Sequence, residues 1–425
     1  MLLKIKYIIA TAILSATMLS ASAQTPAHSS DSDIRVSPKI EFSEEEVEEI
    51  PTFIHLKENK IDMNGADWSA LKKKIACTDS SVFTIVHIGD SHIQADFCTG
   101  KTRALLQSCY GSAGRGLIVP LKLAGTNEPR DYIIKSNSLW QSSKMMKPNE
   151  NVTLGFTGVG ISPIGTKADL TIATLSRTDD AEPFDMFKIY HQGKLLIDSV
   201  SSLEKAVSFS AIYTDSVTTV RLPDAVTGVT LDLSVEEGTA IYGIILTKCN
   251  KGGILYNAIG NNGATYHSYT MLPESARHIG DINPDLIIVS LGANEAFSRM
   301  TPEEMRESID RLVSSLRRCH PGSEILLTTP MECQKSVRIR RKGKKRSRRT
   351  YAVNEKVLTA RNIILDYARD HGVPVYDWYE VAGGTGVSKS WINAGLMAKD
   401  RIHHSYKGYR LQGGLLFDAL NNSLQ

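Results

Sequence analysis

The fold is decided by residues 82–92, which read VFTIVHIGDSH. The apolar, β-branched part of this stretch is typical of a buried strand and is too short for a helix, and Gly89 then allows a backbone geometry that residues with a Cβ disfavour. Apolar residues at helical spacing follow from Ile93 to Cys109, so Ser91 is expected where the strand gives way to a helix. A hydroxyl there lies beside free helix N–H groups, which favour a developing negative charge. Two interpretations of Ser91 remain open from this stretch alone: a nucleophile, or a residue that only caps the helix.

Length and composition describe a globular protein with enough apolar residues for a large core. The chain has 425 residues, of which 42% are hydrophobic and 22% are charged. This length predicts about two or three domains. The net charge of +3 does not by itself indicate a nucleic-acid partner.

The N-terminus has the three parts of a secretory signal peptide. Lys4 and Lys6 precede the apolar run 7–19, and residues 21–23 (ASA) form a small-residue cleavage site. A membrane anchor is the alternative, but the run is shorter than the ~20 residues that span a bilayer. We therefore expect residues 1–23 to be removed and the mature protein to be periplasmic or secreted, with no transmembrane segment. Residues 24–80, which include the acidic run EEEVEE, are predicted to form an N-terminal extension without chemistry of its own.

The cysteines do not form a recognisable motif. The chain has six of them, and none belongs to a C-x-x-C pair, which argues against a zinc or redox site. No His, Cys, Asp or Glu cluster has the spacing of a metal site, so we expect neither a metal nor another cofactor. Export would permit disulfides, while buried free thiols fit the sequence equally well.

The pattern of apolar and turn residues predicts an α/β part and an all-β part in the chain after residue 24. Residues 81–121 form the first α/β segment, and 251–425 form the second. Between them, residues 122–250 contain short alternating segments separated by turn residues, which predicts an inserted β-sandwich. We expect this domain either to bind sugar or only to shape the cleft. A stacking platform for sugar would use some of four aromatic residues: Trp140, Tyr190, His191 and Tyr213.

The second α/β segment alternates strands and helices. The apolar run 284–291 is of the kind that is buried on both faces of a parallel sheet. A capped helix is expected from Thr301 to about His320, a strand at 324–329, a helix at 351–371 and a short strand at 373–377. This order predicts a doubly wound parallel sheet with its site at the carboxyl ends of the strands.

Two loops stand out by composition. The glycine-rich turn 111–116 (GSAGRG) lacks the Lys-Ser/Thr pair of a P-loop, and we interpret it as a substrate-rim loop with Arg115 as a contact. The segment 335–349 holds ten basic residues, and removing these charges from the net charge of +3 leaves −7 for the rest. Such a density of like charge predicts a mobile loop. Its expected partner is an anionic envelope polymer or a membrane surface; a solvated insertion and a protease-sensitive site are the alternatives, and export disfavours nucleic acid.

The last chemical element is the segment DRIHH, residues 400–404. An acid three residues before a histidine can orient the imidazole and stabilise its protonated form while the imidazole takes a proton from a serine. Alone, this pattern is weak. His404 competes with His403 for the role of base, and the spacing from Asp400 favours His403.

Four blocks occur in the order found in the SGNH (GDSL-like) esterase superfamily: residues 89–92 (GDSH), Gly263, residues 292–294 (GAN), and Asp400 with His403. The chain resembles that superfamily over its two α/β segments. Two positions differ from the common pattern. His92 stands in place of a leucine, and Glu295 stands where an aspartate often follows the asparagine.

The resemblance implies the role of each residue. Ser91 would be the nucleophile, His403 the base and Asp400 the residue that orients it. The oxyanion hole would consist of the backbone N–H groups of Ser91 and Gly263 and the side-chain amide of Asn294. Oxyanion stabilisation of this kind is usually the largest single contribution to acyl transfer.

Within the superfamily, residues 89–97 (GDSHIQADF) and 110–116 (YGSAGRG) are similar to periplasmic peptidoglycan O-acetylesterases. Those enzymes also carry an inserted β-sandwich that resembles a carbohydrate-binding module. The sequence therefore predicts an exported serine esterase that removes O-acetyl groups from a glycan, with peptidoglycan as the expected substrate. The alternatives are an esterase on other acylated polysaccharides or lipids, an O-acetyltransferase, and a non-catalytic glycan-binding protein.

Overall fold

The computed structural model describes residues 49–176, 181–203, 205–249, 251–272, 279, 282–340 and 347–425. Residues Ile50–Gln425 form one compact unit. The predicted signal peptide and the acidic run up to residue 48 lie outside the described residues. No helix in the described part of the chain is both long and apolar enough to cross a membrane. All six cysteines are described, and none is paired in a disulfide.

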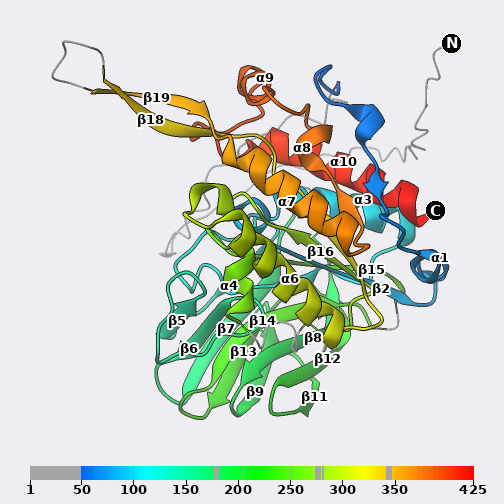
Figure 1. The fold of residues 1–425 in the computed structure, drawn as a ribbon. Coiled ribbons are helices and arrows are strands. Elements are labelled where there is room, and N and C mark those ends of the chain that lie inside the picture. The colour runs from blue at the N-terminus through cyan, green and yellow to red at the C-terminus, as the bar shows by residue number, and fades with distance from the viewer. Residues whose placement is uncertain are drawn as a thin grey trace, which may run out of the picture. The chain divides into compact units, whose positions relative to one another are not determined.

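A six-stranded sheet forms the centre of the α/β part (Figure 1). Its strands lie in the order β15 (Gly253–Gly260), β2 (Val82–Gly89), β16 (Leu286–Ser290), β17 (Glu324–Thr328), β20 (Val375–Tyr376) and β1 (Ile61–Asp62). The first five strands are parallel, and β1 pairs antiparallel with β20. Because β2 is the first of the five parallel strands in the chain but lies between β15 and β16, the strand order reverses there. The predicted doubly wound sheet is confirmed.

Strand β2 is buried on both of its faces. Phe83 and Ile85 belong to one hydrophobic cluster, while Val86 and Ile88 belong to the other. Gly89 ends the strand for a reason other than the expected one, since it has no left-handed backbone conformation. A Cβ at this position would instead lie 2.9 Å from the carbonyl oxygen of Ser290, so the glycine is required by close packing.

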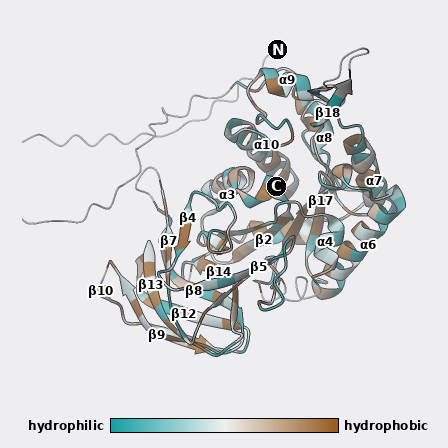
Figure 2. Cartoon of the chain, turned by 90° about the vertical axis from the view of Figure 1, so that its left-hand side faces the viewer, coloured by the Kyte–Doolittle hydropathy of each residue, from teal (hydrophilic) through white to brown (hydrophobic). Residues whose placement is uncertain are grey.

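Two pairs of helices enclose the sheet. Figure 2 shows α3 (Phe97–Tyr110) and α10 (Tyr406–Leu424) on one side, and α6 (Pro302–Cys319) and α7 (Lys356–Asp370) on the other. The predicted cap of α6 is confirmed, because the Thr301 and Glu304 side chains form a reciprocal capping box. The shorter elements are η1 (Leu56–Glu58), α1 (Ser69–Ile75), α4 (Tyr266–Thr270), η2 (Glu295–Phe297), α8 (Trp378–Val381) and α9 (Ser388–Asn393).

Two helix predictions were wrong in their bounds. The expected helix after Ser91 is divided into α2 (Ser91–Gln94) and α3, because Asp96 adopts a left-handed conformation between them. The expected helix 351–371 begins only at Lys356. Its first residues, which include Tyr351, belong to a strand, in keeping with the preference of aromatic and β-branched residues for extended structure.

Two antiparallel sheets lie between β3 (Gly116–Ile118) and β15 in the chain. The five-stranded sheet has the order β10 (Lys205–Ala206), β9 (Leu195–Ser202), β13 (Gly228–Val235), β7 (Lys167–Thr174) and β4 (Tyr132–Lys135). The seven-stranded sheet has the order β11 (Ser210–Tyr213), β12 (Val217–Val226), β8 (Phe184–Gln192), β14 (Ala240–Thr247), β6 (Val159–Pro163) and β5 (Trp140–Lys144), with β3 also paired to β14. The predicted antiparallel strands are therefore present.

The alternation of buried and exposed residues along the strands explains how these sheets bury their inner faces. Strands β7 and β13 alternate between buried and more exposed residues, and Figure 2 shows the same alternation in hydropathy. Their buried residues belong to the same hydrophobic cluster as residues of α6 and α7. The apolar core is thus continuous from the antiparallel sheets to the α/β sheet. The domain boundaries and the likeness to a carbohydrate-binding module stay predictions.

The basic segment differs from the loop that was expected. Strands β18 (Gln334–Arg340) and β19 (Ser347–Val353) form an antiparallel hairpin, while residues 341–346 lie outside the described residues. Apolar and β-branched residues recur along both strands, and backbone pairing stabilises the ribbon despite its charge. The hairpin extends away from the sheets in Figure 1.

Candidate active site

Ser91 lies at the carboxyl end of β2, at the first position of α2. Asp90 caps this helix, because its Oδ1 atom accepts a hydrogen bond of 2.9 Å from the backbone N–H of His92. At the first position of a helix the backbone N–H has no partner within the helix. The Ser91 N–H therefore has no acceptor within α2.

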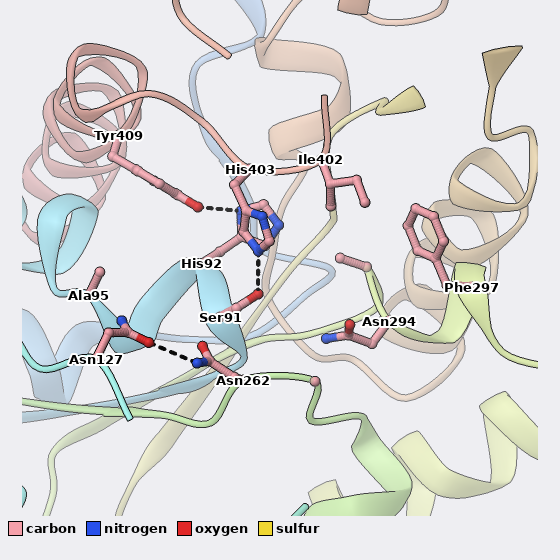
Figure 3. Close-up of a pocket in the computed structure, with 12 residues that line it drawn as sticks. Ser91, His92, Ala95, Asn127, Asn262, Asn294, Phe297, Ile402, His403 and Tyr409 are labelled. Carbon is pink, nitrogen blue, oxygen red and sulfur yellow. Dashed lines mark hydrogen bonds between the residues drawn. The ribbon is translucent and has the colours of Figure 1, made fainter. Parts of the chain in front are cut away.

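Three side chains form a hydrogen-bonded chain that begins at Ser91 (Figure 3 shows its first bond). Ser91 Oγ lies 2.7 Å from His403 Nε2, and His403 Nδ1 lies 2.7 Å from Asp400 Oδ2. The other oxygen of Asp400 accepts hydrogen bonds of 2.9 and 3.0 Å from the backbone N–H groups of Ile402 and His403. This is the geometry of a nucleophile, its base and the residue that orients the base.

The carboxylate of Asp400 is held in its ionised form. Partial burial alone would raise its pKa, but the hydrogen bonds from the His403 imidazole and from two backbone N–H groups outweigh burial and lower the pKa below its usual value. An ionised carboxylate fixes the orientation of the imidazole and stabilises the imidazolium that forms on proton transfer.

His404, the competing candidate for the base, lies elsewhere. Its ring is 5% exposed and stacks on Trp391 with 4.8 Å between ring centroids. Burial lowers the pKa of His404 to about 3, so the side chain is neutral. The structure thus brings His403, and not His404, to Ser91.

Gly263 and Asn294 follow β15 and β16, the two neighbours of β2. Because the carboxyl ends of parallel strands meet at one edge, both residues line the same pocket as Ser91. Gly263 has a left-handed conformation with φ of +84°, and among the described residues its N–H has no hydrogen-bond partner. Asn294 Nδ2 donates to Asp90 Oδ2 at 3.0 Å and to the carbonyl of Ala264 at 2.9 Å.

The pocket has a volume of about 480 Å³. Figure 3 shows the side chains around it. Twelve residues line it: Ser91, His92, Ala95, Asn127, Asn262, Gly263, Ala293, Asn294, Phe297, Ile402, His403 and Tyr409. The mixture of amide groups with a few apolar side chains is typical of a site that fixes a small polar ligand. No group of three or more His, Cys, Asp or Glu residues in the described part of the chain is placed to hold a metal ion.

Two buried carboxyl groups, Asp90 and Glu295, lie next to residues that line the pocket. Burial raises the pKa of Asp90 to about 6 and that of Glu295 to about 7. Burial also lowers the pKa of His92 well below its usual value. Glu295 Oε1 accepts a hydrogen bond of 2.7 Å from the backbone N–H of Tyr266 at the start of α4, so this carboxyl group positions the loop that carries Gly263.

His92 packs against the base, a role that was not predicted from the sequence. The His92 ring lies 5.1 Å from the His403 ring, centroid to centroid, and its Nδ1 atom is 3.0 Å from Tyr409 Oη. The signal was present, because His92 departs from the leucine that is common at this position of the resembling family.

A second missed group is a network of amides at the pocket edge. Gln94 Oε1 accepts a hydrogen bond of 2.8 Å from the backbone N–H of Asn262, and Asn262 Nδ2 donates to Asn127 Oδ1 at 2.8 Å. Gln94 also donates to the carbonyl of Asn127 at 2.9 Å. The network connects the Ser91 turn to the Gly263 turn. Gln94 follows the first motif directly, but nothing in the sequence indicated Asn127.

Arg115 is not a substrate contact. Its side chain is 4% exposed and forms hydrogen bonds of 2.7 Å to Asp96 and 3.0 Å to Asp131. It also lies over the ring of Tyr132 at 4.7 Å. Two nearby carboxylates compensate the buried charge, so the glycine-rich turn has a structural role here.

Two members of the expected stacking platform are buried. Tyr190 and His191 are each 1% exposed, because β8 is an inner strand of the seven-stranded sheet. His191 Nε2 lies 2.9 Å from the hydroxyl of Thr218. Trp140 and Tyr213 lie on β5 and β11, at the two ends of the sheet order. These four residues do not form one surface.

The doubly wound sheet and its Ser-His-Asp geometry define the class of an α/β serine hydrolase. Residues 246–411 match the model of the GDSL-like lipase/acylhydrolase family. This match agrees with the resemblance to GDSL-like (SGNH) esterases that the sequence blocks predicted. No curated protein matches the sequence significantly.

Among solved structures, the chain is similar to one described as a peptidoglycan O-acetylesterase in action. The two are 23% identical, the match covers 85% of this chain and 97% of that chain, and the TM-score is 0.66. This likeness establishes the shared fold. Two other matches are a lipase/acylhydrolase from Enterococcus faecalis (18% identity, 40% of this chain, 77% of that chain, TM-score 0.30) and a family two carbohydrate esterase from Clostridium thermocellum (11% identity, 67% of this chain, 98% of that chain, TM-score 0.30).

Proposed function

We propose that the protein is an exported serine esterase that removes O-linked acetyl groups from a glycan, and that peptidoglycan is its substrate. The observation that carries the proposal is the pair of 2.7 Å hydrogen bonds that connect Ser91, His403 and Asp400 at the pocket. The described peptidoglycan O-acetylesterase of the same fold supports the choice of substrate. The predicted signal peptide supports export to the compartment that holds peptidoglycan.

In the first half of the reaction, Ser91 Oγ attacks the ester carbonyl while His403 takes its proton. The tetrahedral intermediate places a negative charge on the former carbonyl oxygen. The backbone N–H groups of Ser91 and Gly263 are available to donate to that oxygen. His403 then gives its proton to the departing sugar oxygen, which leaves an acetyl group on Ser91.

Asn294 would act as a third donor to the oxyanion. Its Nδ2 group has two hydrogens, and both are engaged, one with Asp90 and the other with the carbonyl of Ala264. The substrate oxygen would therefore replace Ala264 as acceptor, while the bond to Asp90 keeps the amide in place. Water, activated by His403, attacks the acetyl group in the second half of the reaction, and acetate leaves.

The lining of the pocket supports a glycan rather than a lipid as the ester-bearing group. Asn127 and Asn262 offer amide groups at its edge, which suit sugar hydroxyls, beside apolar side chains that include Phe297 and Ile402. A long acyl chain would need a continuous apolar groove.

The test is acetate release from O-acetylated peptidoglycan by the mature protein. Ser91→Ala should lower turnover by up to about 10⁶-fold, the usual cost of removing a catalytic serine. Ser314→Ala, on the exposed face of α6, is the matched control and should retain full activity. Cleavage of a small acetyl ester without cleavage of the polymer would refute the substrate, and cleavage of neither would refute the esterase.

A further inference from the structure

The hairpin of β18 and β19 concentrates positive charge. Residues 333–354 contain ten basic residues and no acidic residue. The hairpin extends from the α/β part in Figure 1, and the described side chains of Arg338 and Arg349 are exposed. In the described part of the chain neither arginine forms an ion pair.

The register of the hairpin places these two arginines on one face. Arg338 lies directly opposite Arg349, and Ser336 lies directly opposite Tyr351. Opposed residues share a face, and so do residues two apart along a strand. Like charges directly opposite each other destabilise a strand pair, so an anion between the two guanidinium groups would stabilise the hairpin.

The same face is connected to the loop that carries Asp400 and His403. The backbone N–H of Gln334 donates to the carbonyl of Arg401 at 2.9 Å, and Arg401 Nη1 donates to Gln334 Oε1 at 2.9 Å. The Arg401 guanidinium lies over the Tyr351 ring at 4.1 Å. These contacts hold Arg401 in a left-handed conformation with φ of +62°, which is uncommon for a residue with a side chain.

A row of cationic and aromatic groups therefore begins at the active site. Arg401 lies within the segment from Asp400 to His403, and the next residue, Ile402, lines the pocket. From Arg401 the row continues over Tyr351 to the pair of opposed arginines on the hairpin. The planar guanidinium group binds carboxylate and phosphate groups with two parallel hydrogen bonds.

We infer that this face (Arg338, Arg349, Tyr351 and Arg401) is the docking surface for an anionic glycan strand whose esterified sugar occupies the pocket at Ser91. The inference rests on the proposed function for the second part of that statement. The partner is a polymer with carboxylate or phosphate groups at intervals along its length. A strand is favoured over a flat membrane surface because the row is narrow and ends at a substrate pocket.

The experiment measures binding to soluble polymers at low and moderate salt. Polygalacturonate supplies carboxylates, inorganic polyphosphate supplies phosphates, and neutral dextran is the uncharged reference. The double variant Arg338→Gln/Arg349→Gln should weaken binding of a polyanion about five- to tenfold, with a smaller salt dependence. Lys72→Gln/Lys73→Gln on α1 is the matched control, because it removes the same charge from two exposed residues, and it should bind like the native protein.

The polyanion that binds more tightly identifies the anionic group that the surface recognises. Equal weakening by both double variants would overturn the inference, because net charge alone would then explain binding. Tighter binding to vesicles of anionic lipid than to either polymer, lost in the arginine variant, would overturn it in favour of a membrane.

Activity separates this inference from the proposed function. The arginine variant should retain native kcat/KM on a small neutral acetyl ester and lose activity only on an anionic acetylated polymer. If the native protein binds polyanions through the hairpin but cleaves no ester, the proposed function fails while the docking surface stands. If Ser91→Ala also loses polyanion binding, the docking surface is not independent of the catalytic residues and the inference fails.

Discussion

The site has two layers that treat ionisable groups in opposite ways. In the upper layer, the side chain of Asp400 is 47% exposed, and the hydrogen bonds it accepts lower its pKa. In the lower layer, Asp90 and Glu295 are almost fully buried, and burial raises the pKa of both. The two layers are connected, because Asp90 accepts the hydrogen bond from Asn294.

The upper layer takes part in the reaction, whereas the lower layer holds the structure around it. A residue that must stabilise a charged imidazolium needs to be ionised itself, which the hydrogen-bonded position of Asp400 provides. The groups below hold backbone turns in place, and burial opposes their ionisation because an unpaired buried charge is costly. The three changes that follow test this comparison.

Removing the charge of Asp400, in the upper layer, should have the largest effect on turnover. Asp400→Asn keeps the size of the side chain but cannot stabilise the imidazolium of His403, so kcat should fall about 10³- to 10⁴-fold with little change in KM. The measurement is steady-state hydrolysis of a small acetyl ester. Asp366→Asn, an exposed aspartate on α7, is the control. A fall of less than tenfold would show that Asp400 does not act on the base.

Removing the charge of Glu295, in the lower layer, should affect the free energy of unfolding rather than turnover. The pKa of Glu295 is about 7 in the folded protein against an ordinary value of 4.5. Between these values the folded state binds more protons than the unfolded state, so native stability falls as the pH rises from about 4.5 to 7. Glu295→Gln resembles the protonated acid and should escape this loss, with a free energy of unfolding about 1 to 3 kcal/mol above native at pH 8.

Urea unfolding at pH 4.5, 6 and 8 measures this difference. Asp90 also has a raised pKa, and both proteins contain it, so the difference between them reports Glu295 together with its interaction with Asp90. Glu150→Gln, at an exposed position, should follow the native curve. If the difference in free energy of unfolding between the native protein and Glu295→Gln does not widen with pH, Glu295 does not have a raised pKa in the folded protein.

The upper layer was predictable from the sequence because its groups occur in short motifs. Ser91 lies in a strand-to-turn segment, and Asp400 and His403 are three residues apart, so local patterns and chain order were sufficient. The parallel sheet followed from apolar runs such as 284–291, which become buried on both faces. The closeness of Ser91 to His403 still depended on the resemblance, since 312 positions separate the two in the chain.

The lower layer and the hairpin depended on tertiary contacts that no local pattern carries. Arg115 had the composition of a rim residue, yet Asp96 and Asp131 make it a buried ion-pair partner. The charge of the segment 335–349 predicted a loop, and the outcome was decided instead by strand pairing between Gln334 and Val353. Backbone pairing along the two strands outweighs the repulsion between the opposed residues Arg338 and Arg349.

His92 connects the two layers, and replacing it should have the smallest of the three effects. Its ring packs against His403 from below, and burial keeps it neutral, so it does not repel the imidazolium that forms above it. His92→Leu retains most of the volume but loses the ring contact and the hydrogen bond to Tyr409. Because aromatic pairs contribute about 0.5–1.5 kcal/mol, kcat should fall roughly two- to tenfold with KM unchanged.

The matched control is His371→Leu, which removes a histidine that stacks on Tyr367 at 4.2 Å, away from the pocket. Thermal unfolding of both variants separates a loss of stability from a loss of positioning. If His92→Leu lowers Tm as much as His371→Leu but leaves kcat at the native value, His92 is only a packing residue. A selective fall in kcat would place it with the groups that hold the base in line with Ser91.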